Sequence, residues 1–220
     1  MNPAVEATTL YRFFRAGDEE TLALQSVSLT LHPGEFVTVV GPSGSGKSTL
    51  LSCLAGIDEP DGGSVLVGGR RMSHQPETVR ARLRADTLGL LLQNRNLLPH
   101  LTVRQNIALV HRIIKNPRRE SIMPLLDSLG ISDRPDALPY NLSGGELARA
   151  GLAVALANDP IAVLADEPTG ELDGSSEREV LQALKHRAAN GTAILVASHS
   201  SAVADASDRV IRLSDGRITA

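Results

Sequence analysis

The sequence predicts an α/β fold, in which a mostly parallel sheet is accompanied by an antiparallel β-lobe and a helical subdomain. Three short apolar runs, at residues 36–40, 161–165 and 193–197, are typical of buried parallel strands, and each is followed by glycine, acidic or histidine residues. Glycine turns separate alternating segments before residue 70, which indicates antiparallel pairing. Apolar residues at helical spacing between 102 and 130 predict two helices between strands of one sheet.

The composition fits a single domain with its own core. The chain has 220 residues, of which 42% are hydrophobic, and no run approaches the roughly 18 apolar residues needed to cross a bilayer. Residues 1–10 lack a basic segment followed by an apolar run, so we expect a soluble and unexported protein that meets a membrane only through another molecule. The formal net charge of -3 supplies no general basic field, which disfavours a DNA-repair or RNA-bound protein. The single cysteine, Cys53, cannot form an internal disulfide and is predicted to be a core residue in a reducing compartment.

Residues 22–40 are predicted to form a β-hairpin that leads into the segment after residue 40. Val27–Leu31 alternates in the manner of a strand, the pattern breaks at residues 32–34, and the chain resumes as the apolar run 36–40. A turn at 61–63 and a short strand at 64–67 extend the predicted antiparallel lobe beside the parallel sheet.

A glycine-rich loop follows the run 36–40 and precedes an apolar helix. Its glycines let successive backbone N–H groups turn inward around phosphate oxygens, and the helix dipole points its positive end at the same anion. Lys47 can then reach β- and γ-phosphates, and the Ser48 hydroxyl can bind Mg²⁺. We interpret the loop as a nucleoside triphosphate site, against the alternative of a plain strand-to-helix turn. The loop comprises Gly41, Pro42, Ser43, Gly44, Ser45, Gly46, Lys47, Ser48 and Thr49.

Polar side chains at the ends of other predicted strands form a second set of candidates. Asp166 follows the strand 161–165 and can hold the Mg²⁺ shell, and Glu167 can orient or deprotonate an attacking water. His199 follows the strand 193–197 and is placed to bind a γ-phosphate. Gln93 follows an apolar strand at 88–92, where either a ligand contact or simple solvation fits.

The helical region contains a second glycine motif. Helices are predicted at 102–115, with Thr102 as its cap, and at 117–130, with Gly130 closing it. After them, the motif Leu142–Glu146, which includes Ser143, Gly144 and Gly145, precedes a helix at 147–158. Its free N–H groups and the Ser143 hydroxyl either cap structure alone or complete the nucleotide site of another subunit.

With these motifs in order, nearly the whole chain resembles the nucleotide-binding subunit of an ABC transporter. The resemblance implies one domain over 1–220, in which 1–92 and 159–220 form a RecA-like P-loop NTPase core with the β-lobe, and 93–158 forms the helical subdomain with the signature motif. The matching segments are Walker A at 41–49, the Q-loop at Gln93, the LSGGE signature at 142–146, Walker B at 161–167, the D-loop at 170–173 and the switch histidine at His199.

The same resemblance implies partners and ligands. A second copy, or a homologous ATPase subunit, packs head to tail, so that each ATP lies between the Walker A motif of one subunit and Ser143 to Gly145 of the other. Asp173 of the D-loop is assigned to nucleotide binding. Among the scarce aromatic residues, Phe14 is expected to stack on adenine, with Tyr11 as the reserve and simple packing as the alternative.

Residues 96–102, the run 165–170 and the short C-terminus resemble the group containing the MacB, LolD and FtsE ATPases. That resemblance implies a transmembrane permease with an extracytoplasmic domain, and a position on the cytoplasmic side of the plasma (inner) membrane. It also implies that residues 93–106 line the groove for the coupling helix of the permease. Efflux, lipoprotein release and mechanotransmission remain open, and no nucleic acid is expected.

The mechanism that the resemblance implies is Mg²⁺-dependent attack of water on the γ-phosphate of ATP. Lys47, His199 and the opposing Ser143 hold the γ-phosphate, and Glu167 polarises the water. Ser48, Gln93 and, through water, Asp166 hold the metal.

Several residues depart from the family pattern. Leu147 and Ala148 replace polar residues after the signature, Val154 and Glu171 replace the common arginine and the common asparagine or serine, and Ser200 stands where aspartate is common. These changes are expected to weaken dimer closure or to make the two composite sites unequal. Two rival interpretations remain: a soluble ABC ATPase acting on nucleic acid or ribosomes, and a slow ATPase that serves as a regulatory scaffold.

Overall fold

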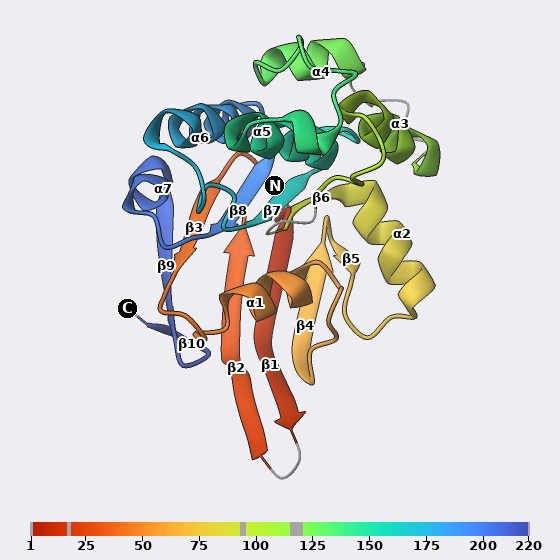
Figure 1. The fold of residues 1–220 in the computed structure, drawn as a ribbon. Helices are drawn as coiled ribbons and strands as arrows, with labels where there is room; N and C mark the ends of the chain where they lie inside the picture. Colours follow the sequence, from red (N-terminus) through yellow and green to blue (C-terminus); the bar gives the residue numbers. More distant parts are fainter. Residues whose placement is uncertain (1, 17–18, 93–95, 115–120, 220) are drawn as a thin grey trace.

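The computed structural model describes residues 2–16, 19–92, 96–114 and 121–219, which form two sheets and the helices around them (Figure 1). The elements are, in chain order, β1 (Val5–Ala16), β2 (Glu19–Leu31), β3 (Phe36–Val40), α1 (Lys47–Leu54), β4 (Gly62–Val67), β5 (Arg70–Arg71), α2 (Glu77–Thr87), β6 (Leu88–Leu91), α3 (Val103–Ile113), α4 (Ile122–Ser128), the 3₁₀ turn η1 (Pro139–Asn141), α5 (Gly144–Leu156), β7 (Ala162–Asp166), α6 (Gly174–Ala189), β8 (Ala193–Ala197), α7 (Ser201–Ala206), β9 (Arg209–Ser214) and β10 (Arg217–Thr219).

The larger sheet confirms the predicted mostly parallel arrangement. Its strand order in the described chain is β10-β9-β3-β8-β7-β6, and every neighbouring pair is parallel except β10 with β9. Successive residues of its inner strands face two different cores: Val163 and Ile194 face one, while Leu164 and Leu195 face the other. Both faces are covered, which explains why these strands are continuous apolar runs rather than alternating ones.

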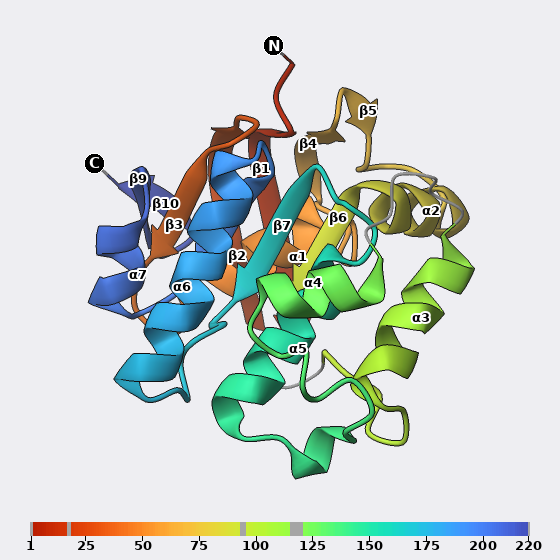
Figure 2. The same cartoon turned by 90° about the horizontal axis from the view of Figure 1, so that it is seen from above.

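The helix α1 lies between the two sheets. It contacts β7 and β8 of the larger sheet and β1 and β2 of the smaller one. On the opposite face of the larger sheet, α6 packs on β3 and β8, α7 on β3 and α5 on β6, as the view from above shows (Figure 2). Cys53 is fully buried in α1, as predicted.

The smaller sheet confirms the antiparallel lobe but corrects its predicted membership. Its order is β2-β1-β4-β5, and β2 pairs with β1 rather than with β3. The predicted hairpin 22–40 is therefore wrong, because β2 and β3 belong to different sheets. The alternating β2 has one core face and suits an antiparallel pair, whereas β3 is buried on both faces and lies between β8 and β9. Gly34, at φ +79, lies in the connection that carries the chain from one sheet to the other.

The predicted cap of the first helix after β6 is confirmed. Thr102 accepts a hydrogen bond from the Gln105 amide at 3.2 Å and forms a complete capping box at the start of α3. Gly130, at φ +64, follows the end of α4. Residues 115–120 of the two predicted helices lie outside the described residues, and the division at 93–158 stays a prediction. Within the described part of the chain, no helix combines the length and apolar character needed to cross a membrane.

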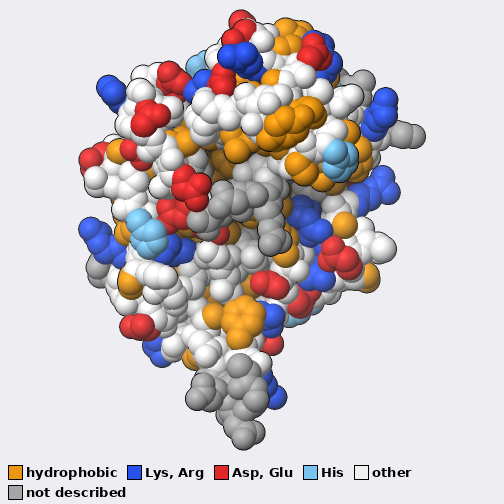
Figure 3. Space-filling view, viewed as in Figure 1, with side chains coloured by type: hydrophobic (Ala, Val, Ile, Leu, Met, Phe, Trp, Pro, Cys, Tyr) orange, Lys and Arg blue, Asp and Glu red, His pale blue; other side chains and the backbone are white. Residues whose placement is uncertain are grey.

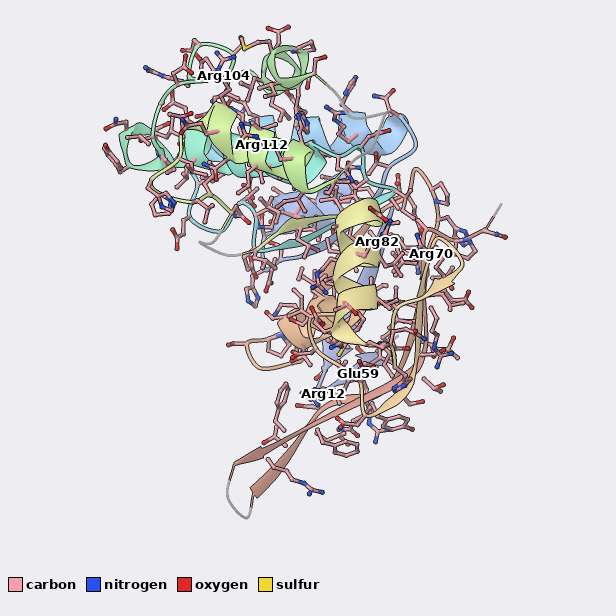
Figure 4. All side chains as sticks on the ribbon, turned by 90° about the vertical axis from the view of Figure 1, so that its right-hand side faces the viewer. Arg12, Glu59, Arg70, Arg82, Arg104 and Arg112 are labelled. Atoms are coloured by element: carbon pink, nitrogen blue, oxygen red, sulfur yellow. The ribbon has the colours of Figure 1, made fainter. Side chains whose placement is uncertain are left out.

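The helix α2 was not anticipated, because its sequence is rich in arginine and only Leu83 is buried. Arg80 attaches it to the rest of the fold through an ion pair with Glu59 at 2.6 Å, and Arg84 does so by donating to the Gly56 carbonyl at 2.9 Å. Both arginines also pair with Glu77 within the helix itself. Figure 4 shows α2 from outside, with Glu59 below its lower end and α3 above it. Charged contacts of this kind leave no apolar periodicity in the sequence.

Candidate functional site

A cleft of about 1490 Å³ lies where the glycine loop meets the carboxyl ends of β7 and β8 and the first turns of α5. In the space-filling view of this face, acidic, basic and histidine side chains lie close together between the helices above and the β-sheets below (Figure 3). The predicted site residues that line the cleft are Phe14, Ser43, Gly44, Ser45, Gly46, Lys47, Ser48, Thr49, Gly144, Asp166, Glu167 and His199. Gln93 lies outside the described residues, and its predicted roles stay predictions.

The glycine loop is held between strands of both sheets. A Cβ at Gly41 would overlap the carbonyl oxygen of Leu213 on β9, and a Cβ at Gly46 would overlap that of Ala23 on β2. The Gly216 amide also donates to the Ser45 carbonyl at 3.1 Å. Only glycine allows the backbone to approach this closely, so these two glycines set the position of the loop.

The loop presents unsatisfied donors to the cleft. Gly46 is the N-cap of α1 and has no side chain to cap the first turn, so the leading N–H groups of α1 lack the usual acceptor. The buried Ser45 hydroxyl has no hydrogen-bond partner among the described residues. Free N–H groups at a helix start and an unsatisfied hydroxyl together suit a phosphate-type anion.

Lys47 places a positive charge at the same point. Its ammonium nitrogen donates to the Gly41 carbonyl at 2.8 Å and to the Pro42 carbonyl at 3.1 Å, and it lies 3.5 Å from His199 Nε2. The residue is 7% exposed, so its charge faces the cleft rather than bulk solvent. This arrangement strengthens the attraction of the loop for an anion.

The carboxylate of Glu167 lies next to His199. Its Oε2 accepts hydrogen bonds from the Ser198 hydroxyl at 3.1 Å and from the His199 amide at 3.4 Å. Its Oε1 is 3.3 Å from His199 Nε2 but is buried and lacks hydrogen-bond geometry to any described group. Glu167 also has φ +46, a strained conformation for a residue with a side chain. A strained, partly unsatisfied carboxylate beside a histidine is typical of a functional site.

Two oxygen ligands in the cleft suit a magnesium ion. Ser48 begins α1 and Asp166 ends β7, and both line the cleft. Neither side chain has a hydrogen-bond or ion-pair partner in the described part of the chain. No group of three or more His, Cys, Asp or Glu residues surrounds a metal position among those residues. Mg²⁺ commonly binds through one or two protein oxygens and completes its shell with water and phosphate, so the donor set fits.

The Ser143 hydroxyl caps α5. It accepts from the Glu146 amide at 3.3 Å, and Glu146 Oε2 accepts from the Ser143 amide at 2.8 Å. Hydrogen bonds from Ser143, and then from Arg134, hold the pKa of the Glu146 carboxyl below its usual value. Ser143 and Gly144 are both exposed, whereas Gly145 packs against Ser176. The structure thus shows the capping role, and the contribution to another subunit stays a prediction.

Asp173 is the N-cap of α6 and does not line the cleft. Its carboxylate accepts from the Ser175 hydroxyl and from the amides of Ser176 and Ser175, at 3.0 and 2.9 Å, and these bonds hold its pKa far below the usual value. Its predicted nucleotide contact stays a prediction.

Phe14 and Tyr11 occupy different places on β1. Phe14 lines the cleft with its ring 41% exposed, and the Arg12 guanidinium carbon lies 4.7 Å from the ring centroid. Tyr11 is outside the cleft lining and faces Gly62. The structure therefore places Phe14, and not the reserve residue, at the mouth of the cleft. Its stacking role remains a prediction.

Several residues of the cleft were not singled out from sequence. Glu177 and Thr169 lie on its wall, and Glu177 stands in the first turn of α6 without any recognisable motif. Only the spatial approach of the loops after β7 and β8 reveals them.

The sequence profile of the family described as ABC transporter matches residues 24–170. The chain belongs to the ABC transporter family. A solved structure described as dimeric MJ0796, a bacterial ABC transporter cassette, superposes with a TM-score of 0.90 at 32% identity, over 98% of this chain and 97% of that one. The same cassette has been solved as a post-hydrolysis dimer bound to ADP and Pi, with the same score, identity and coverage. The expected ABC ATPase fold is confirmed.

Curated relatives of this ABC cassette confirm the resemblance to the MacB group. The macrolide export ATP-binding/permease protein MacB of Burkholderia pseudomallei (strain 1710b) is 42% identical over 219 residues, which cover 98% of this chain and 34% of that protein. The MacB of Rhodospirillum rubrum is 41% identical over the same length, with the same two coverages. The chain thus spans about a third of the length of these relatives.

Proposed function

We propose that this cassette binds ATP with Mg²⁺ and hydrolyses it, in a head-to-tail pair with a second copy or a homologous ATPase subunit. The observation that carries the proposal is the single cleft that gathers Lys47, Ser48, Asp166, Glu167 and His199 from the glycine loop and two strand ends. Together they supply an anion cradle, a pair of metal ligands and a carboxylate for water, which are the parts that phosphoryl transfer needs.

We assign each residue a role in the reaction from its position in the cleft. Lys47 and His199 hold the γ-phosphate from one side, and Ser143 of the opposing subunit holds it from the other. Ser48, Asp166 through water, and Gln93 hold the metal, whose charge supplies electrostatic stabilisation of the transferred phosphoryl group. Glu167 orients and polarises the attacking water through the carboxylate oxygen that His199 approaches. Phe14 stacks on adenine, and Asp173 belongs to the D-loop of the same composite site.

The pairing and the membrane partner rest on the relatives. The dimer described for MJ0796 and its ADP- and Pi-bound form support a dimeric ATPase. The MacB relatives are named as ATP-binding/permease proteins for macrolide export, which supports coupling to a permease. We therefore place the cassette on the cytoplasmic side of the plasma (inner) membrane, bound to a permease with an extracytoplasmic domain and not to nucleic acid. Efflux, lipoprotein release and mechanotransmission are the candidate outputs.

The decisive variant is Glu167→Gln, which removes the negative charge but keeps the shape of the side chain. We expect ATP hydrolysis to fall by about 100-fold or more. Binding of Mg-ATP is retained, and the variant elutes as a dimer with Mg-ATP in size-exclusion chromatography with light scattering. Lys185→Ala, an exposed change on α6, serves as a control with unchanged hydrolysis. Full activity in Glu167→Gln would contradict the assignment of the water-polarising residue.

The permease is tested with the same trapped form. Glu167→Gln is used to capture partners from detergent-solubilised native membranes with Mg-ATP, and the captured proteins are identified by mass spectrometry. Recovery of a permease with a large extracytoplasmic domain supports the proposal. Recovery of soluble proteins or nucleic acid alone, together with hydrolysis stimulated by DNA or ribosomes, would contradict the transport proposal. It would favour a soluble ABC ATPase that acts on nucleic acid or ribosomes.

A slow ATPase acting as a regulatory scaffold is the second candidate. The observation that favours it is the apolar surface after the signature motif, where Leu147 is 39% exposed and Ala148 lines the cleft. Apolar side chains there supply no hydrogen bonds to an opposing nucleotide. Negligible hydrolysis in the presence of the cognate permease would favour this candidate.

A further inference from the structure

One carboxylate joins the loops that follow β7 and β8. Glu177, in the first turn of α6, lines the cleft. Its Oε1 accepts a hydrogen bond from the Thr169 hydroxyl at 3.1 Å and another from the Ser200 hydroxyl at 2.7 Å. Thr169 is 3% exposed and belongs to the loop after Glu167, whereas Ser200 directly follows His199. Glu177 thus connects the two segments that carry the proposed catalytic pair.

The contact with Ser200 continues to Glu167. The Ser200 amide donates to the Ser198 hydroxyl at 3.1 Å, and that hydroxyl donates to Glu167 Oε2 at 3.1 Å. Ser198 is fully buried, so no water competes for its hydroxyl. An unbroken series of hydrogen bonds therefore runs from Glu177 through Ser200 and Ser198 to Glu167.

The orientation of Ser200 is unusual for its position. Ser200 is the N-cap residue of α7, where a serine side chain normally accepts from the first-turn amides. Here its side chain makes no cap bond, and its hydroxyl instead donates to Glu177. Without this cap bond, α7 is less stable than it would be with a capping serine. The Ser200 hydroxyl instead links its own loop to Glu177.

We propose that Glu177 is a positioning residue for the proposed hydrolysis: through Ser200, its carboxylate holds segment 198–200 against the loop after β7 and thereby orients Glu167 and His199. In the family pattern, aspartate is common at the position of Ser200; in this chain, a carboxylate reaches the same segment from α6 instead. The catalytic consequence rests on the function proposed above, whereas the structural contact does not. A purely helix-stabilising role is the alternative, because any acidic residue in a first turn favours the helix dipole.

Kinetics distinguish the two roles. We expect Glu177→Ala to lower kcat about tenfold with KM for ATP changed by less than about twofold, because the side chain orients reacting groups rather than the nucleotide. Glu177→Gln keeps an accepting oxygen and restores kcat to within about threefold of wild type. Ser200→Ala matches Glu177→Ala, and the double variant is no slower than either single one, since both act through one contact. Losses of kcat that add up in the double variant would overturn the proposal. A loss of kcat in Glu177→Ala that accompanies a lower Tm, and that Glu177→Gln does not restore, would overturn it as well.

A second measurement does not depend on hydrolysis. In hydrogen–deuterium exchange without nucleotide, the peptide covering 198–206 is expected to exchange faster in Glu177→Ala than in wild type. The Ser200 hydroxyl loses its acceptor on Glu177, so Ser200 is held less firmly and the hydrogen bond from its amide to the Ser198 hydroxyl opens more often. Lys185→Ala, on the exposed side of the same helix, leaves that exchange unchanged. Unchanged exchange in Glu177→Ala would overturn the positioning role whether or not the wild-type protein hydrolyses ATP. A wild-type protein without hydrolysis would contradict the proposed function alone, and the exchange result would then decide this inference.

Discussion

The substitutions Gly44→Ala and Gly46→Ala test how the glycine loop is held in place. Both glycines have positive φ, +78 and +102, so an added methyl group is strained at either position. They differ in their surroundings. A Cβ at Gly44 meets nothing within 4 Å, whereas a Cβ at Gly46 would overlap the backbone carbonyl of Ala23 on β2. The pair therefore separates backbone strain from steric contact with the smaller sheet.

The expected magnitudes follow from these two terms. A left-handed conformation costs an alanine about 1–2 kcal/mol, and the reduced freedom of the unfolded chain returns about 0.4–1 kcal/mol. Gly44→Ala is thus expected to lower the free energy of unfolding by about 1 kcal/mol. Gly46→Ala carries a further overpacking cost of about 2 kcal/mol, because a backbone carbonyl in a paired strand cannot move aside cheaply. Gly46→Ala is thus expected to lower the free energy of unfolding by about 3 kcal/mol.

Urea denaturation without nucleotide measures the difference. Taking a denaturant dependence of about 3 kcal/mol per molar, we expect the midpoint to fall by about 0.3 M for Gly44→Ala and by about 1 M for Gly46→Ala. Nucleotide is left out because the loop amides belong to the proposed binding site. Equal shifts in the two variants would refute the reasoning, since they would show that the β2 carbonyl does not limit the position of the loop.

Three further predictions concern single contacts. Burial raises the pKa of the Cys53 thiol to about 12, so its alkylation at about pH 8 should be roughly 10³-fold slower in the native protein than in denaturant, and equal rates would contradict the buried placement. Thr102→Ala removes the acceptor at the start of α3 and should cost about 1 kcal/mol in thermal unfolding, whereas Thr102→Asp keeps an acceptor and should cost little. The Phe13 amide, and then Arg12, hold the pKa of the Asp61 carboxyl below its usual value. The ionised carboxyl therefore stabilises the folded protein at pH values above the unfolded pKa of about 3.9, and this contribution to the free energy of unfolding is lost on acidification. The Tm difference between wild type and Asp61→Asn should therefore shrink below about pH 4, and a constant difference would count against the contact.

Local patterns predicted much of the fold and of the site. The strand at 193–197 and the cap at Thr102 both depend on neighbouring residues, and the structure shows each of them. The loop from Gly41 was also visible, because its glycines and Lys47 are consecutive in the chain. Such features can be predicted since their physical cause, backbone conformation or hydrophobic periodicity, lies within a few residues.

Only the tertiary structure decided which elements meet. Sequence proximity suggested that β2 pairs with β3, but burial on both faces moved β3 between β8 and β9. The support of Gly46 by a β2 carbonyl, and the contacts of Glu177 with Thr169 and Ser200, join segments with no shared local pattern. The sequence by itself determined the chemistry of the chain: an anion-binding loop, acidic strand ends and a histidine. Their alignment in one cleft was decided by the packing of two sheets around α1, because apolar burial is non-directional and many pairings satisfy one sequence pattern.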